Sequence, residues 1–169
     1  MIISFYIIAA VAIVATIMVI TRFNAIHALL YLIVSLLAVS MIFFLFGAPF
    51  AAALEVIIYA GAVMVLFVFV IMMLDMGREG LQLEQAWFNP KMWMGPMVLA
   101  LILVVALLDI VLDGSTTRTS NVMLIGPQQV SEKLFHLYVI GVELASFLLL
   151  PGLISAYHLG RKARSGEVS

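Results

Sequence analysis

Residues 51–74 read AAALEVIIYAGAVMVLFVFVIMML, an almost unbroken apolar run in which Glu55 is the single charged residue. A helix needs about 20 apolar residues to cross the hydrocarbon core of a bilayer, so this run predicts a membrane-spanning helix. Strands of a membrane barrel would be about 10 residues long and would alternate between apolar and polar positions. The run shows no such alternation, and it therefore predicts an all-α integral membrane protein.

Four further apolar runs extend this prediction to the whole chain. Of the 169 residues, 66% are hydrophobic and 10% are charged, whereas about 25% of an ordinary soluble domain is charged. Five membrane-spanning helices are expected in a single membrane domain over residues 1–169, at about 2–20, 26–46, 51–74, 92–112 and 134–159. The first run has no Lys or Arg before it and is longer than the apolar part of a signal peptide, so it is expected to be retained.

Charge and residue types exclude several classes of function. The net charge is −1 and no basic stripe is present, which argues against a nucleic-acid partner. The chain has no cysteine, so it can provide no thiolate for a zinc site or an iron–sulfur cluster. The sequence shows no metal-ligand cluster, no pairing of a nucleophile with a base and no phosphate-binding glycine loop. No metal, bound cofactor or catalytic centre is therefore expected in this chain alone.

The distribution of Lys and Arg predicts the orientation in the membrane, because cytoplasmic loops carry an excess of these residues. One side of the predicted bundle carries six of them, Arg22, Arg78, Lys91, Arg161, Lys162 and Arg164, and the other carries two, Arg118 and Lys133. The N-terminus is therefore expected outside, on the periplasmic side of a bacterial membrane, and the C-terminus in the cytoplasm.

Three acidic residues fall within predicted spans, where ionisable groups are costly and tend to mark function. Glu55 and Glu143 are the candidates for a functional role. For each, the alternative is a carboxyl group that is held by a neighbouring helix, and His136 is a possible partner of Glu143 on the same helix face. Asp109 lies near the end of its span, so its carboxyl group is expected to reach water.

Small residues interrupt the run at Tyr59-Ala60-Gly61-Ala62. They permit close packing of a neighbouring helix, and this is the simpler interpretation. The functional interpretation is a place where the helix changes its winding, since π-bulges favour functional sites. Tyr59 follows Glu55 by one turn on the same face and can extend a hydrogen-bonded chain from the carboxyl group. From the residues alone, a part of a transporter, a channel and a structural subunit all remain open.

Four segments of the chain carry a resemblance to a known family. Residues 55–74 closely resemble the third helix of the subunit J family of bacterial NADH–quinone oxidoreductase, respiratory complex I, whose mitochondrial counterpart is subunit 6. Residues 27–32, HALLYL, are similar to the start of that family's second helix, and residues 141–146, GVELAS, to its fifth. The tail, residues 160–168, is similar as well. The resemblance covers nearly the whole chain and is weakest in the loops 75–91 and 113–133.

The resemblance implies a role in proton translocation. In that family the subunit carries no redox centre; FMN, the iron–sulfur clusters and quinone are handled by other subunits of the complex. It lies in the bacterial inner membrane between the quinone-site subunits and the antiporter-like subunits. A π-bulge is expected in its third helix, as a conformational switch that couples quinone reduction to proton pumping.

Carried over to this chain, the resemblance implies a set of site residues. The switch falls on Tyr59, Ala60, Gly61, Ala62, Val63, Met64, Val65 and Phe67. Glu55, Tyr59 and Glu143 are implied on the proton path. Two alternatives are a related subunit of a multisubunit cation/proton antiporter or membrane-bound hydrogenase, and a self-contained small transporter or channel.

Overall fold

The computed structural model describes residues 2–74, 90–112 and 125–162. Across these residues every regular element is a helix, and five helices are long and apolar enough to cross a membrane. These candidate spans are Ile2–Thr21, Ala25–Leu45, Pro49–Met73, Trp93–Leu112 and Val139–Gly160. The prediction of an all-helical chain with five candidate membrane-spanning helices is thus confirmed.

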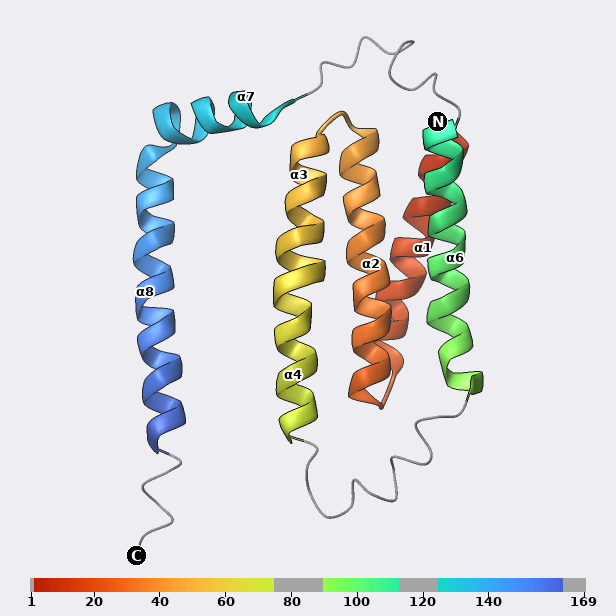
Figure 1. The fold of residues 1–169 in the computed structure, drawn as a ribbon, viewed down its shortest axis with the longest axis horizontal. Helices are drawn as coiled ribbons and strands as arrows, with labels where there is room; N and C mark the ends of the chain where they lie inside the picture. The colour runs from red at the N-terminus through yellow and green to blue at the C-terminus, as the bar shows by residue number, and fades with distance from the viewer. Residues whose placement is uncertain (1, 75–89, 113–124, 163–169) are drawn as a thin grey trace, which may run out of the picture. The chain divides into compact units, whose positions relative to one another are not determined.

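The chain divides into two compact units, residues 1–125 and residues 126–169. The first contains α1 (Ile2–Thr21), α2 (Ala25–Leu45), α3 (Pro49–Leu54), the π-helix η1 (Glu55–Val63), α4 (Met64–Leu74) and α6 (Pro90–Leu112). The second contains α7 (Pro127–Glu132), the π-helix η3 (Lys133–Leu137) and α8 (Val139–Lys162). Figure 1 shows α3 and α4 as parts of one continuous helix, with η1 between them.

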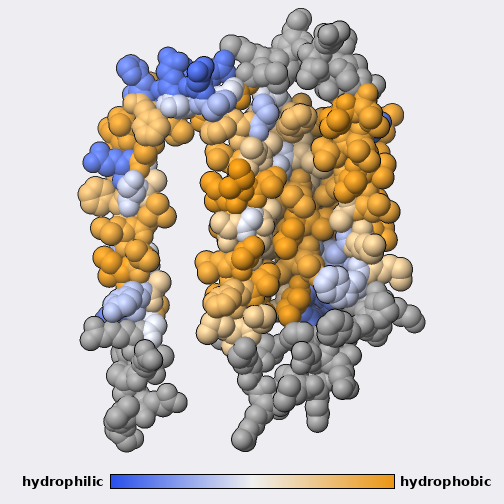
Figure 2. Space-filling model, viewed as in Figure 1, coloured by the Kyte–Doolittle hydropathy of each residue, from blue (hydrophilic) through white to orange (hydrophobic). Residues whose placement is uncertain are grey.

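The core of the first unit forms where α1, α2 and α6 meet. Its buried residues are Ile8, Val11, Ala15, Val34, Ala38, Leu103, Ala106 and Ile110. Ala15 and Ala38 are 0% exposed; small side chains at such positions let two helices approach closely and gain packing contacts, which drive helix association inside a bilayer. Apolar side chains also cover most of the face of this unit that Figure 2 shows, as expected for a surface in contact with lipid or with other apolar surfaces.

Hydroxyl groups join the helices of the first unit in pairs. The Thr16 and Ser35 hydroxyls lie 2.8 Å apart and link α1 to α2. The Ser4 hydroxyl donates to an Asp109 carboxylate oxygen at 3.2 Å and links α1 to α6. Interhelical hydrogen bonds of this kind contribute about 0.6 kcal/mol each in a membrane protein. They fix the relative positions of the helices more than they stabilise the bundle.

The two ends of α2 are specified locally. At its start, the Asn24 side-chain oxygen accepts hydrogen bonds from the backbone N–H groups of Ile26 and His27, at 3.0 and 3.4 Å, which satisfies donors that the helix leaves free. At its end, Gly47 has φ 78°, a conformation that glycine adopts without steric cost. The Gly47 carbonyl also accepts from the Ile125 N–H at 2.9 Å. The chain therefore reverses between α2 and α3 in a well-defined turn.

A close contact joins α2 and α6 near the other end of the bundle. A Cβ atom built on Gly95 would overlap the hydroxyl oxygen of Tyr31, so a larger residue there would have to displace the Tyr31 ring. Tyr31 is buried, and the Arg22 guanidinium lies 5.6 Å from the centroid of its ring. An Arg over an aromatic face is attracted by the ring quadrupole. These three residues tie the start of α6 to the turn between α1 and α2.

The second unit differs from the predicted fifth helix at its start. The apolar run suggested a helix from about residue 134, whereas α8 begins at Val139 and a bend at Tyr138, with φ −111° and ψ 23°, precedes it. Before the bend, Lys133–Leu137 is wound as a π-helix. His136 and Glu143 therefore do not share the face of one continuous α-helix, which was the premise for pairing them.

A short helix also lies in the stretch that the sequence suggested was a polar loop. α7 begins with Pro127 after Gly126. Proline is favoured at the first helical position because its N–H would be unsatisfied there in any case and its φ is already helical. This local signal is sufficient for one and a half turns, although the segment is too polar to resemble a membrane span.

Candidate functional site

The third membrane-spanning helix changes its winding in its middle. The chain is α-helical over Pro49–Leu54, π-helical over the nine residues Glu55–Val63, and α-helical again from Met64. At the end of the π segment the Met64 N–H points to the carbonyl of Tyr59, five residues earlier, and to that of Gly61. π winding is rare and is found mostly at functional sites, so this segment is the leading candidate.

Gly61 lies inside the π segment at a point of tight backbone packing. A Cβ atom at this position would lie 3.2 Å from the Val56 carbonyl oxygen, five residues earlier. That separation is closer than ordinary van der Waals contact between carbon and oxygen, so a larger residue would press against the helix's own backbone. The absence of a side chain at Gly61 thus accommodates the π winding.

The side chains of the π segment are not packed in the chain's own core. No residue of η1 is buried, and Tyr59 is 52% exposed. Among the implied switch residues, Met64 is buried at 4% exposure, whereas Val65 and Phe67 face outward. The segment therefore presents most of its surface to whatever surrounds this chain in the membrane.

Glu55 is the first residue of the π segment and is half-buried. Its N–H is directed at the carbonyls of Ala51 and Ala52. Among the described residues no hydrogen bond joins its carboxyl group to Tyr59, so the chain of hydrogen bonds suggested for this pair is not formed in this conformation. The two side chains do belong to one helix segment, one turn apart.

Ser40 holds the end of the third helix that precedes the π segment. Its hydroxyl donates to the Ala52 carbonyl at 2.8 Å, in a buried hydrogen bond from α2 to α3. Sequence reasoning did not single out Ser40. The signal was a hydroxyl side chain inside an apolar span, which inside a bilayer favours a partner on a neighbouring helix. The bond fixes the helix three residues before its winding changes.

The other two membrane acids have different surroundings. Asp109, on α6, accepts the hydrogen bond from Ser4, so a neighbouring helix holds its carboxyl group. Glu143 is exposed and belongs to α8, in the second unit. Glu55 and Tyr59 thus belong with the implied switch residues to one helix of the first unit, and Glu143 belongs to the second unit.

The candidate site has the properties of a conformational element in a membrane. Across the parts of the chain that the structure describes, no group of three or more His, Asp or Glu residues can hold a metal ion. What the π segment offers instead is one carboxyl group, one phenol and a stretch of π winding between two α-helical segments.

Comparison with known proteins gives close and nearly full-length matches. A family profile described as NADH-ubiquinone/plastoquinone oxidoreductase chain 6 matches residues 15–159. The NADH-quinone oxidoreductase subunit J of Escherichia coli K12 is 50% identical over 165 residues, which cover 98% of this chain and 89% of the relative. That of Pseudomonas aeruginosa is 51% identical over 159 residues, covering 94% and 96%. That of Buchnera aphidicola from Schizaphis graminum is 45% identical over 160 residues, covering 95% and 98%.

Proposed function

The chain belongs to the family of NADH-quinone oxidoreductase subunit J, and from this membership we propose that it couples quinone reduction to proton pumping by a change of winding in its third helix. It is a multi-pass membrane subunit of the respiratory enzyme complex. The electron carriers, FMN and the iron–sulfur clusters, and the quinone are assigned to other subunits. This chain contributes a movable helix and no redox chemistry.

One observation carries the proposal, the π-helical winding of Glu55–Val63 around Gly61. An α-helix holds 3.6 residues per turn, so the gain or loss of one residue in the winding rotates the helix beyond it by about 100°. In this chain the rotation would act on α4 and would move Phe67 and Val65, which face outward. A bulky face can thereby replace a small one and open or close a path for water.

The proton path is proposed to include Glu55, Tyr59 and Glu143. Glu55 opens the segment that rewinds, so its surroundings change with the winding. Tyr59 can donate to the carboxylate or pass a proton onward once the two groups are brought together. Glu143 would continue the path from the fifth span. An element with two discrete states that respond differently to quinone is what coupling requires.

The remaining features of the proposal concern the surroundings of the subunit. Its partners are proposed to be the quinone-site and antiporter-like subunits of the complex, in the inner membrane of a bacterium. The N-terminus is proposed to face the periplasm and the C-terminus the cytoplasm, because of the Lys and Arg distribution. The family matches do not favour a self-contained transporter, a cation/proton antiporter subunit or a hydrogenase subunit.

The test compares two glycine substitutions in the assembled complex. Gly61→Val places a branched side chain against the Val56 carbonyl, where a Cβ has only 3.2 Å. Gly141→Val is the matched control, since a Cβ there meets nothing within 4 Å. Overpacking of this kind costs about 1–3 kcal/mol, and each 1.4 kcal/mol shifts a population about tenfold.

The measurement uses inverted membrane vesicles, in which NADH-driven quinone reduction and acidification of the interior are followed together. Gly61→Val is expected to lower both by about tenfold or more at an unchanged amount of assembled complex, and Gly141→Val to leave both near the wild-type values. Normal turnover and normal acidification in an assembled Gly61→Val complex would refute the switch.

A further inference from the structure

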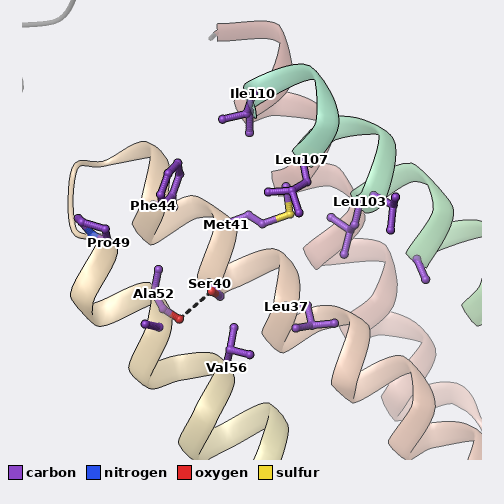
Figure 3. Close-up of a pocket in the computed structure, with 13 residues that line it drawn as sticks. Leu37, Ser40, Met41, Phe44, Pro49, Ala52, Val56, Leu103, Leu107 and Ile110 are labelled. Atoms are coloured by element: carbon purple, nitrogen blue, oxygen red, sulfur yellow. Dashed lines mark hydrogen bonds between the residues drawn. The ribbon is translucent and has the colours of Figure 1, made fainter. Parts of the chain in front are cut away.

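An elongated cavity of about 480 Å³ lies in the first unit, beside the start of the π segment. Its walls come from α2, from α3 with the first turn of η1, and from α6 (Figure 3). Met41 and Phe44 line it from α2, Ala53 and Val56 from the third helix, and Leu103 and Ile110 from α6. All three walls are membrane-spanning helices, so the cavity lies within the bilayer.

The lining of the cavity is apolar except for one residue. Ser40 provides the one hydroxyl group among its lining residues, and that hydroxyl already donates to the Ala52 carbonyl at 2.8 Å (Figure 3). A buried water needs two to four polar partners, and no other side chain in the lining offers one. The occupant must therefore be apolar.

The length and depth of the cavity match one leaflet of a membrane. Along α6 the lining extends over eleven positions, from Ala100 to Ile110, which is about 15 Å at 1.5 Å per residue step. The hydrocarbon core of a bilayer is about 30 Å thick, so one leaflet accounts for about 15 Å. One end of the cavity lies at Phe44 and Pro49, by the turn between α2 and α3, and the other lies at Val56 and Ala100, near the middle of the spans.

We propose that this cavity binds one acyl chain of a bilayer phospholipid, inserted from the leaflet on the side of the α2–α3 turn. A volume of about 480 Å³ over this length is enough for one extended acyl chain. The chain would pack along Met41 and Leu107 and end against Val56. A phospholipid headgroup would then lie at the level of Pro49, at the membrane surface.

A second protein helix fits this cavity less well. A helix with its side chains is about 10–12 Å across, so it could not enter between the three walls and could place only its side chains in a cavity of about 480 Å³. An acyl chain is thin, flexible and present at high concentration along the open side of the cavity. It also needs no polar partner.

The experiment uses the complete respiratory complex in membranes that contain phosphatidylethanolamine with a photoreactive diazirine in one acyl chain. In one preparation the diazirine is near the terminal methyl group, and in a second it is near the carbonyl group. After irradiation, the labelled residues of this subunit are mapped by mass spectrometry of peptides. The deep diazirine is expected to label Val56 and Ala100, and the shallow diazirine Phe44 and Ile110.

Substitution at the cavity wall supplies the control. Ala53→Phe puts a ring into the cavity and is expected to reduce both labelling patterns several-fold. Ala10→Phe adds the same ring on the exposed face of α1, outside the lining, and should change neither. Ala100→Leu is a smaller filling substitution that replaces Ala53→Phe if the latter fails to assemble.

Three outcomes would overturn the proposal. The first is labelling that does not follow the depth of the diazirine. The second is labelling that persists in the assembled Ala53→Phe or Ala100→Leu complex. The third is displacement by a quinone with an isoprenoid tail, or cross-linking of the cavity residues to a protein segment, which would assign the cavity to that occupant instead.

Discussion

The α1–α2–α6 core and the third helix are built from equally apolar sequence, yet they are packed very differently. In the 18-residue apolar stretch of α2, 33% of the residues are buried, compared with 6% in the corresponding stretch of the Pro49–Met73 span. Hydroxyl groups and alanine contacts lock the core, whereas η1 has no buried residue. The α1–α2–α6 core is therefore held by the chain's own contacts, whereas the side chains of η1 are left free to contact what surrounds the chain in the membrane. The proposed rewinding of the third helix would therefore take place against fixed neighbouring helices.

The largest expected effect concerns the third helix and proton transfer rather than stability. Glu55→Gln keeps the size of the side chain but cannot exchange a proton. Loss of a proton-transfer group slows that transfer by about 10²-fold or more, so acidification per electron is expected to fall sharply while the complex still assembles. Simultaneous measurement of NADH oxidation and vesicle acidification checks this.

Asp109→Asn is the matched control, since the Asp109 carboxyl group is hydrogen-bonded to Ser4 at the end of its span. A normal ratio of protons to electrons in Glu55→Gln would remove Glu55 from the path.

The next effect concerns the core and is an effect on stability. Gly95→Ala brings a methyl group into the Tyr31 hydroxyl, and overpacking costs about 1–3 kcal/mol. The amount of this subunit in purified complex and its thermal transition are expected to fall. Tyr31→Phe in the same chain removes the overlapping oxygen and should restore part of the loss. If Gly95→Ala alters turnover without altering assembly, the contrast between a structural core and a functional third helix is wrong.

The smallest expected effect concerns the hydroxyl pair within the core and its contribution to stability. Thr16→Val and Ser35→Ala each remove one side of the hydroxyl pair between α1 and α2. A double-mutant cycle on thermal stability is expected to give a coupling of about 0.6 kcal/mol. A coupling near zero would show that the hydroxyl pair adds nothing to the apolar packing that holds these two helices together.

The sequence predicts the number of spans well because each apolar run is long enough to cross the membrane by itself. The boundaries follow less well. Leu134 to Leu137 is apolar except for His136 and was predicted to be part of the last span, but it is wound as a π-helix and ends at the Tyr138 bend. The Asn24 cap of α2 could have been recognised, since Asn before an apolar run is a common helix start.

The candidate site, like the fold, could be predicted from the sequence only in part. The small residues around Gly61 mark an unusual position in the sequence, and the structure gives a physical reason in the 3.2 Å approach to the Val56 carbonyl. By contrast, neither the Ser40 bond to Ala52 nor the Ser4 bond to Asp109 follows from the sequence. Each depends on which helices become neighbours, and apolar spans carry little information about that choice.

The Ser4–Asp109 hydrogen bond has a consequence for the biogenesis of the protein. It joins residues 105 positions apart, whereas the Thr16–Ser35 pair is separated by 19. At a synthesis rate of about 5–20 residues per second, Asp109 on α6 is synthesised about 5–20 s after Ser4 on α1. The α1–α2 hairpin can therefore assemble at the translocon first, and the third helix has already been inserted when α6 arrives. The order of translation thus places the third helix in the membrane before the α1–α2–α6 core is closed.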